Sequence, residues 1–300
     1  MTIEDWLKWA KTQIDTLDAE LILLHRVAPK NSDRSWLVTH GNLELDQDDQ
    51  ELISDWVAER RSGVPLAYVL GYKEFYGRRF AVIRGVLIPR PETEALIDLI
   101  RELDLPRRAR ILDMGTGSGC IAITLALEFP QAYVMGVDTS YEALTMAQFN
   151  DTRFDGRVEF VNSDLFDGLD LDAEFSTSSD SVGANELLLS HELRQNERHF
   201  DVLVANLPYV SRDWDWVDTE QLKFEPKTAL FAGQNGLALY RRLFAEYQQY
   251  ITVHYVVVEA DLCQHAELIK LAEQTGLKHR KTLGYGLLFE NPQYQVASAE

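Results

Sequence analysis

The segment 111–121 combines a short apolar run, three closely spaced glycines and the start of a helical pattern. Glycine lets the backbone turn tightly and approach a ligand because it has no Cβ, and a helix N-terminus offers unpaired N–H groups. An acid, Asp138, ends the next apolar run about 20 residues further on, the offset at which a carboxylate reaches a ribose. This pattern predicts a nucleotide-type cofactor site. Its candidate residues are Asp113, Gly115, Thr116, Gly117, Ser118, Gly119 and Asp138.

The spacing of the glycines separates two classes of cofactor. Loops that bind dinucleotides read G-x-G-x-x-G and hold a pyrophosphate against the helix. Here the loop reads G-x-G-x-G and follows Asp113, which would repel a pyrophosphate but attract the cationic methionyl part of S-adenosylmethionine. The sequence therefore favours S-adenosylmethionine over a nicotinamide cofactor, which stays an alternative. Asp164 and Leu165 follow the third apolar run and are expected at the adenine amino group and ring, although a strand-end cap would explain Asp164 equally well.

The tetrapeptide Asn206-Leu207-Pro208-Tyr209 ends the fourth apolar run and is the candidate catalytic and acceptor site. Ligands of an open α/β sheet bind beyond the carboxyl ends of its strands, so we expect these residues to face the cofactor. The Asn206 side-chain carbonyl and the main-chain carbonyl of Leu207 can accept both hydrogens of a planar NH₂ group, while Tyr209 can stack on its plane. Such a clamp would align the nitrogen with the S–CH₃ bond and stabilise the positive charge that develops there.

The elements that must position these residues follow from the hydrophobic pattern. Apolar runs with the composition of buried parallel strands lie at 111–112, 133–137, 158–161, 202–205 and 255–258. Helical patterns lie between or after them, at 121–129, 141–150, 237–250 and 263–275. This alternation predicts a doubly wound α/β sheet. A polar, Ser-rich stretch near 172–198 interrupts it and is predicted to be a surface insertion.

The first 63 residues show only helical periodicity, which predicts a small helical domain. Thr2, Asp18 and Asp46 are the candidate N-caps, and Pro29 and Gly63 are the candidate ends of the second and third helices. The β-forming residues 75–83 predict a hairpin that bridges two domains. We therefore expect a helical domain over 1–72, a bridging hairpin over 73–88 and an α/β domain that carries the candidate site over 89–293.

Composition narrows the range of partners. The formal net charge of −19 disfavours a nucleic-acid substrate, because such affinity comes largely from Lys and Arg, although a solvated acidic surface explains most of the excess. Cys120 and Cys263 lack metal-ligand spacing, so no metal site or disulfide framework is expected. No signal peptide and no apolar run near the ~20 residues of a membrane span is present. We expect a cytoplasmic monomer without membrane contact.

Further motifs are spread over nearly the whole chain. They are Pro65-Leu66-Ala67-Tyr68 with Gly71, Leu87-Ile88-Pro89-Arg90-Pro91-Glu92-Thr93-Glu94, Phe224-Glu225-Pro226, Gly236-Leu237 and Tyr240-Arg241. With the glycine loop and the tetrapeptide, they resemble the motifs of the bacterial peptide chain release factor glutamine methyltransferases, and the run from Pro89 to Glu94 is the most specific of them. The resemblance implies an S-adenosylmethionine-dependent methyltransferase of class I with a mostly parallel, Rossmann-like seven-stranded sheet. It also implies that the small N-terminal helical domain helps to dock the substrate protein and that residues 89–293 form the methyltransferase domain.

The same resemblance implies a class I release factor as the protein partner and the glutamine amide of its Gly-Gly-Gln motif as the group held by Asn206. It places Arg90 and Glu92 near the mouth of the cleft, unless they only shape the entry to a helix. The chain departs from the family pattern at Leu207, where proline is usual, at residues 259–261, where a glycine is common, and in the Ser-rich stretch.

Two other functions stay open at this point. Asn-Leu-Pro-Tyr also resembles the motif of ribosomal RNA adenine dimethyltransferases, in which the same clamp would hold an exocyclic amine; the acidic charge and the Pro89 to Glu94 run disfavour that function. A non-catalytic protein that binds S-adenosylmethionine is the other alternative, and the intact glycine loop, Asp138, Asn206 and Tyr209 argue against it.

Overall fold

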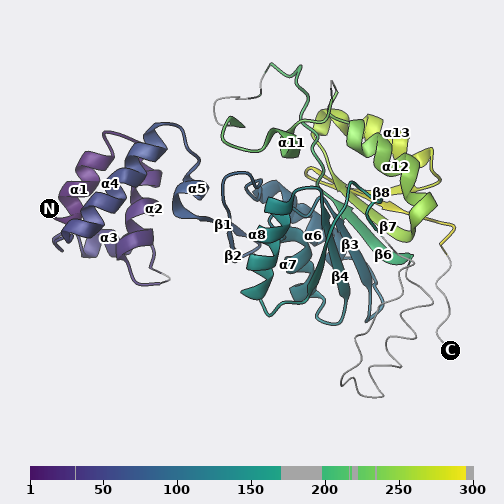
Figure 1. The fold of residues 1–300 in the computed structure, drawn as a ribbon, viewed down its shortest axis with the longest axis horizontal. Helices are drawn as coiled ribbons and strands as arrows, with labels where there is room; N and C mark the ends of the chain where they lie inside the picture. Colours follow the sequence, from purple (N-terminus) through teal and green to yellow (C-terminus); the bar gives the residue numbers. More distant parts are fainter. Residues whose placement is uncertain (31, 170–197, 216, 218–221, 234, 295–300) are drawn as a thin grey trace.

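The structure is a computed structural model that describes residues 1–30, 32–169, 198–215, 217, 222–233 and 235–294. The insertion predicted near 172–198 lies outside these residues, apart from residue 198. Within the described part, no helix is long and apolar enough to cross a membrane. Two groups of elements are visible in Figure 1, a set of helices at the N-terminus and a larger α/β body.

The N-terminal helices are α1 (Ile3–Ala10), α2 (Thr16–Val27), α3 (Arg34–Thr39), α4 (Gln47–Arg61) and α5 (Leu66–Leu70). Helices α1 to α4 enclose a core of their own that includes Trp6, Ile22 and Ile53. The predicted caps Thr2 and Asp46 are confirmed, since their side chains accept from Asp5 N and Asp49 N. Helices α3 and α5 are each short, and the sequence did not predict them.

The predicted cap of α2 was wrong. The side chain of Asp15, not Asp18, accepts a hydrogen bond from Leu17 N. Asp18 lies inside the first turn of α2, where its carboxylate accepts from Arg60 of α4 at 2.5 Å. Both aspartates suit the start of a helix, and the long-range ion pair, which periodicity does not reveal, accounts for Asp18.

A hairpin of β1 (Tyr72–Phe75) and β2 (Arg78–Ala81) links the helical part to the α/β body (Figure 1). The buried side chain of Asn150 fixes it there. Its Oδ1 accepts from Ala81 N at 2.7 Å, and its Nδ2 donates to Ala81 O at 3.0 Å and to Ser118 O at 2.9 Å. One side chain therefore ties the hairpin to the glycine loop. Beyond the hairpin, η1 (Pro91–Thr93) leads into α6 (Glu94–Arg101).

The α/β body contains a seven-stranded sheet in the order β5-β4-β3-β6-β7-β9-β8. Strands β3 (Arg110–Met114), β4 (Tyr133–Asp138), β5 (Val158–Asn162), β6 (His199–Ala205) and β7 (Thr252–Glu259) are parallel. Strand β9 (Gly286–Glu290) runs antiparallel to both β7 and β8 (Lys278–Leu283). The predicted mostly parallel, Rossmann-like sheet is confirmed, and all five predicted strands are present. The sequence pattern did not predict β8 and β9.

Helices cover both faces of this sheet. They are α6, α7 (Cys120–Glu128), α8 (Tyr141–Thr152), α12 (Ala238–Tyr250) and α13 (His265–Glu273), with η2 (Leu262–Gln264) before α13. The short α11 (Lys227–Leu230) lies at the carboxyl edge of the sheet. Successive strand residues point to opposite faces, so Leu112 joins the core beneath α12 and α13, whereas Ile111 joins the core beneath α6 and α7. The carboxyl ends of β3 to β7 thus meet at one buried edge of the sheet.

Replacing Asn150 with alanine should destabilise the fold. The change leaves three main-chain groups without their partner, and we expect the free energy of unfolding to fall by about 2–4 kcal/mol, measured by urea denaturation. Gln148→Ala is the matched control, because Gln148 is exposed on the same helix; its effect should stay within about 0.5 kcal/mol. Equal losses in the two variants would show that Asn150 does not hold the hairpin.

Candidate active site

A cavity lies at the carboxyl edge of the sheet, where the strand order reverses between β3 and β6. The loops after β3, β4, β5 and β6 line it. Its sides are closed by residues 85–87, which follow the hairpin, and by Pro226, Thr228 and Ala229 at the start of α11 and within it. Ligands of open α/β sheets bind at this topological position. Of the predicted site residues, those that line the cavity are Gly115, Gly117, Asp138, Asp164, Leu165, Asn206, Leu207 and Pro208.

The glycine loop approaches the cavity because its backbone takes conformations that suit glycine. Gly115 has φ 79°, and a Cβ on it would lie 3.0 Å from Leu207 Cδ2. Gly117 has φ 57°, and its N–H donates to Asp138 Oδ2 at 2.9 Å. Asp138 Oδ1 accepts from Ser140 N, also at 2.9 Å. Burial raises the pKa of Asp138, while these N–H groups lower it. The carboxylate is thereby fixed in the cavity wall, and its oxygens can still accept from hydroxyl groups.

Asp113 was predicted to lie beside the charged end of the cofactor, but it does not line the cavity. Its Oδ2 accepts from Thr116 Oγ1 at 2.7 Å and from Ala122 N at 3.2 Å, and its Oδ1 is buried without a hydrogen-bond partner. Burial raises the pKa of Asp113 to about 7. Asp113 therefore joins the glycine loop to the start of α7 from behind the cavity.

The other predicted loop residues, Thr116, Ser118 and Gly119, also lie behind the cavity wall. Thr116 and Ser118 are buried. A Cβ on Gly119 would lie 2.8 Å from Ile123 Cδ1 and 3.1 Å from Ala147 Cβ, so this glycine serves the close packing of α7 on α8. These three residues, predicted to contact the cofactor, thus have structural roles in the loop whose Gly115 and Gly117 line the cavity.

Asp164 and Leu165 lie together at the far side of the cavity, after β5. Leu165 is buried, with φ 50°, and its side chain belongs to the core beneath α12. Asp164 is exposed at the cavity rim, where it pairs with Arg242 at 3.0 Å. Leu165 presents an apolar surface and Asp164 a hydrogen-bond acceptor beside it, which suits the face and the amino group of an adenine.

The Asn206 side chain is held from its amino end. Asn206 Nδ2 donates to Thr93 Oγ1 at 2.9 Å, and the carboxamide lies against the cavity. In this orientation Oδ1 is available as an acceptor. The orientation of an amide is assigned from its hydrogen bonds, and in this structure Nδ2, not Oδ1, faces the Thr93 hydroxyl.

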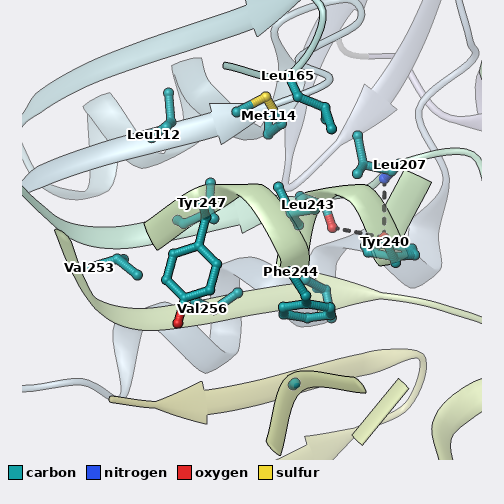
Figure 2. Packing of buried hydrophobic residues seen from close by; sticks show 14 of the residues in the cluster. Leu112, Met114, Leu165, Leu207, Tyr240, Leu243, Phe244, Tyr247, Val253 and Val256 are labelled. Atoms are coloured by element: carbon teal, nitrogen blue, oxygen red, sulfur yellow. Dashed lines mark hydrogen bonds between the residues drawn. The ribbon is translucent and has the colours of Figure 1, made fainter. Parts of the chain in front are cut away.

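The main chain of the tetrapeptide is fixed by a buried tyrosine. Leu207 N donates to Tyr240 Oη at 3.1 Å, and Tyr240 Oη lies 2.5 Å from Glu259 O and 3.2 Å from Ala205 O, to either of which it can donate. Figure 2 shows Tyr240 beside Leu207, joined by this hydrogen bond. Burial raises the pKa of Tyr240, so the hydroxyl stays protonated. A proline at position 207 would have no N–H to donate.

Tyr209 was predicted to stack on the acceptor, but here its side chain does not line the cavity. Its hydroxyl donates to Glu259 Oε1 at 3.0 Å. Its main-chain oxygen accepts from Gln264 Nε2 at 2.8 Å and would lie 1.9 Å from a Cβ on Gly236. The end of the tetrapeptide is therefore packed against β7 and the loop before α12, an arrangement that only glycine permits at 236.

Glu259, the last residue of β7, is the most unusual group of this region. It is 1% exposed, and its Oε2 has no hydrogen-bond partner within the described residues. Burial raises the pKa of Glu259, whereas hydrogen bonds from Thr93, Tyr209 and Asn206 lower it. The nearby charge of Glu92 raises it further. A buried carboxylate thus lies directly behind the acceptor residues.

Arg90 and Glu92 were predicted at the mouth of the cleft, but neither lines the cavity. Arg90 Nη2 donates to Glu225 Oε1 at 2.6 Å, and Ile88 N donates to Glu225 Oε2 at 3.2 Å. Because Glu225 precedes Pro226, a cavity-lining residue, Arg90 holds one wall of the cavity in place. Glu92 is exposed on η1.

Several residues of this site received no role from the sequence. Glu259 follows the fifth predicted strand, so the strand-end rule that found Asp138 and Asn206 could also have found it. Thr93 and Tyr240 stood inside recognised motifs, but nothing in those motifs indicated their contacts. In the loop at 85–87, only Leu87 stood in a recognised motif, and no sequence pattern assigned any of the three residues a role at the cavity. Within the described residues, no group of His, Cys, Asp and Glu side chains could hold a metal ion.

The fold and the site define a class, the Rossmann-like methyltransferases. A family model described as a methyltransferase domain matches residues 106–275, and one described as the PrmC N-terminal domain matches residues 3–71. The more particular assignment comes from curated relatives named release factor glutamine methyltransferase. The one from Koribacter versatilis is 41% identical over 240 residues, which cover 79% of this chain and 75% of that protein.

Two further relatives carry the same name. The Neisseria gonorrhoeae protein is 36% identical over 244 residues, 81% of this chain and 78% of that protein. The Xylella fastidiosa protein is 33% identical over 271 residues, 89% of this chain and 88% of that protein. This chain belongs to the release factor glutamine methyltransferase family.

Tyr240→Phe should destabilise the protein, because the buried N–H of Leu207 loses its acceptor. We expect the free energy of unfolding to fall by about 1–3 kcal/mol, measured by denaturant titration. Tyr247→Phe on the same helix is the control. The Tyr247 hydroxyl contacts Gln248 and Thr275 at the edge of the fold, so its removal should cost about 1 kcal/mol or less. A smaller loss for Tyr240→Phe than for Tyr247→Phe would contradict the proposed anchoring.

Proposed function

We propose that this protein transfers a methyl group from S-adenosylmethionine to the side-chain amide nitrogen of the glutamine in the Gly-Gly-Gln motif of a class I peptide chain release factor. The observation that carries the proposal is Asn206, which lines the cavity and whose Nδ2 donates to Thr93 Oγ1, which leaves Oδ1 as the end of the carboxamide that can accept from a substrate NH₂ group. The names of the curated relatives support the same acceptor.

The cavity fits S-adenosylmethionine. Gly115 and Gly117 let the backbone approach the ligand, and Asp138 offers carboxylate oxygens to the ribose hydroxyls. Asp164 and Leu165 offer an acceptor and an apolar surface to the adenine. When bound, S-adenosylmethionine would supply an electrophilic methyl group on a sulfonium. Among the described residues, the cavity lining contains the acids Asp138 and Asp164 and no Lys or Arg, so no basic side chain of the lining opposes that positive charge.

The acceptor residues address the weak nucleophilicity of an amide. The nitrogen lone pair is delocalised into the carbonyl group, and two hydrogen bonds from the NH₂ group to Asn206 Oδ1 and to the Leu207 main-chain oxygen increase the electron density on nitrogen. The same contacts fix the nitrogen relative to the methyl group. The Tyr240 hydrogen bond holds the Leu207 peptide in place for this task.

The direct test is mass spectrometry of a release factor co-expressed with this chain. We expect one added methyl group on the glutamine of Gly-Gly-Gln, and no modification when the chain is omitted. Binding of S-adenosylmethionine without methylation of any release factor would favour the non-catalytic protein, and methyl transfer to ribosomal RNA alone would favour the adenine methyltransferase.

Asn206→Ala should remove most of the methyl transfer and leave the donor bound. Loss of one of the two acceptors misplaces the nitrogen, so we expect kcat to fall by about 100-fold or more. Calorimetry should give a Kd for S-adenosylmethionine within about twofold of the wild-type value. The idea of an amide clamp fails if the methylation rate is unchanged.

Asp138→Ala should instead weaken donor binding, by about 10-fold to 100-fold in Kd, because a ribose loses its charged acceptor. Calorimetry with S-adenosylmethionine measures this directly. Glu142→Ala is the matched control, since Glu142 is an exposed acid just beyond the same strand; its Kd should not change. Equal affinities in the two variants would count against the ribose contact.

A further inference from the structure

The clamp works only if Asn206 presents its oxygen to the acceptor. A carboxamide has a donor end and an acceptor end of nearly the same shape, and a flipped Asn206 would direct its NH₂ group at the NH₂ group of a glutamine. The position next to the cavity therefore needs a second layer of residues that selects one orientation. Thr93 Oγ1, at 2.9 Å from Asn206 Nδ2, is the first member of that layer.

Thr93 alone does not make the selection, because a hydroxyl can donate as well as accept. Glu259 removes that ambiguity. A carboxylate accepts only, and Glu259 interacts with Thr93, Asn206 and Tyr209, three groups that can each donate to it. A Thr93 hydroxyl hydrogen directed at Glu259 would leave a lone pair on Thr93 Oγ1 for Asn206 Nδ2.

We infer that Glu259 is a positioning residue for methyl transfer: its buried carboxylate fixes the hydroxyls of Thr93 and Tyr209 and the NH₂ end of Asn206, and so turns Asn206 Oδ1 toward the acceptor nitrogen. The inference rests on the proposed function and adds a residue that does not line the cavity. It also gives a reason for a carboxylate that is 1% exposed and has one oxygen without a partner.

The surroundings of Glu259 make this device sensitive to pH. The titratable side chains that face it within the described residues are Glu92, Tyr209, Tyr240 and Cys120. Burial raises the pKa of both tyrosines and raises that of Cys120 to about 12, so these three stay neutral. Protonation of Glu259 would place a donor against Thr93 and Asn206. We therefore expect kcat to fall as the pH falls through the raised pKa of Glu259.

Stability should respond in the opposite direction. A carboxyl group whose pKa is raised by folding stabilises the protein most below its unfolded-state pKa, and this contribution is lost as the pH rises through the folded-state value. At a pH above its raised pKa, the ionised Glu259 is thus a cost to the fold. A neutral residue of the same shape at position 259 should leave Tm unchanged or raise it. If the carboxylate served only to stabilise the fold, the same substitution would lower Tm.

The experiment compares Glu259→Gln with Asp201→Asn. Asp201 is also a buried carboxylate, but it lies near the start of β6, at the other end of the sheet. For Glu259→Gln we expect kcat on the release factor to fall by about 10-fold to 100-fold, with an unchanged Kd for S-adenosylmethionine, a Tm that is not lowered, and no acid limb in the pH profile of kcat. Asp201→Asn should keep the wild-type kcat and its acid limb.

Retention of the wild-type kcat by Glu259→Gln would overturn the inference. The same holds for a lowered kcat that keeps the wild-type acid limb, or one accompanied by a matching loss of Tm. Thr93→Val provides a second variant, with Thr124→Val as its control, because the buried Thr124 hydroxyl has no partner within the described residues. Equal kcat values in these two variants would also overturn the inference.

A readout without substrate separates this inference from the proposed function. In the full chain labelled with ¹⁵N-asparagine, the side-chain NH₂ signal of Asn206 is identified by its absence in Asn206→Ala. Its chemical shift should follow the titration of Glu259 and lose this pH dependence in Glu259→Gln. A shift that does not change with pH in the wild-type chain refutes the role of Glu259, whatever the methylation assay gives. Failure of the wild-type chain to methylate a release factor counts against the proposed function alone.

Discussion

A buried carboxylate needs hydrogen-bond donors around it. This requirement organises the half of the cavity where we place the group that receives the methyl. Glu259 draws its donors from Thr93 before α6 and from Asn206 and Tyr209 after β6, segments that are far apart in the sequence. Leaving such a charge unpaired would cost several kcal/mol, so the three segments converge at the end of β7. The half of the cavity assigned to S-adenosylmethionine also contains a carboxylate held by hydrogen bonds, because Asp138 accepts from Gly117 N and Ser140 N.

The two halves of the cavity are joined through Leu207. Its side chain packs against Gly115, so that even a Cβ at 115 would touch it, and its N–H donates to Tyr240. A proline at this position would restrict φ through its ring and would have no N–H that needs a hydrogen-bond acceptor. Leucine leaves φ free and adds a buried N–H, which must find an acceptor. The Tyr240 hydroxyl meets that need and carries the constraint from the tetrapeptide to the core beneath α12.

The sequence predicted which residues lie at the carboxyl ends of the strands, but it did not predict the side-chain contacts behind the cavity wall. Parallel strands must end on one side, so Asp138 and Asn206 could be placed at the cavity from their positions alone. The hydroxyl of Tyr209 could not, because its partner Glu259 is 50 residues away and periodicity does not report which side chains meet. For a related reason the pattern gave the position of Asp113 near the end of β3, but not that its side chain lies outside the cavity lining. The short α3 and α5 carried too few residues to show a period.

The two hydrogen-bond acceptors of the site, Asn206 Oδ1 and the Leu207 main-chain oxygen, also favour a glutamine amide over a glutamate carboxylate as the substrate group. Glutamine and glutamate have nearly the same shape, but the oxygens of a carboxylate would meet Asn206 Oδ1 and the Leu207 main-chain oxygen, and an acceptor facing an acceptor is repelled. The buried carboxyl group of Glu259 near these residues, when ionised, increases that repulsion. An NH₂ group meets the same oxygens with two donors. Discrimination therefore comes as much from the penalty on glutamate as from the hydrogen bonds to glutamine, which is how a small site separates two side chains of equal size.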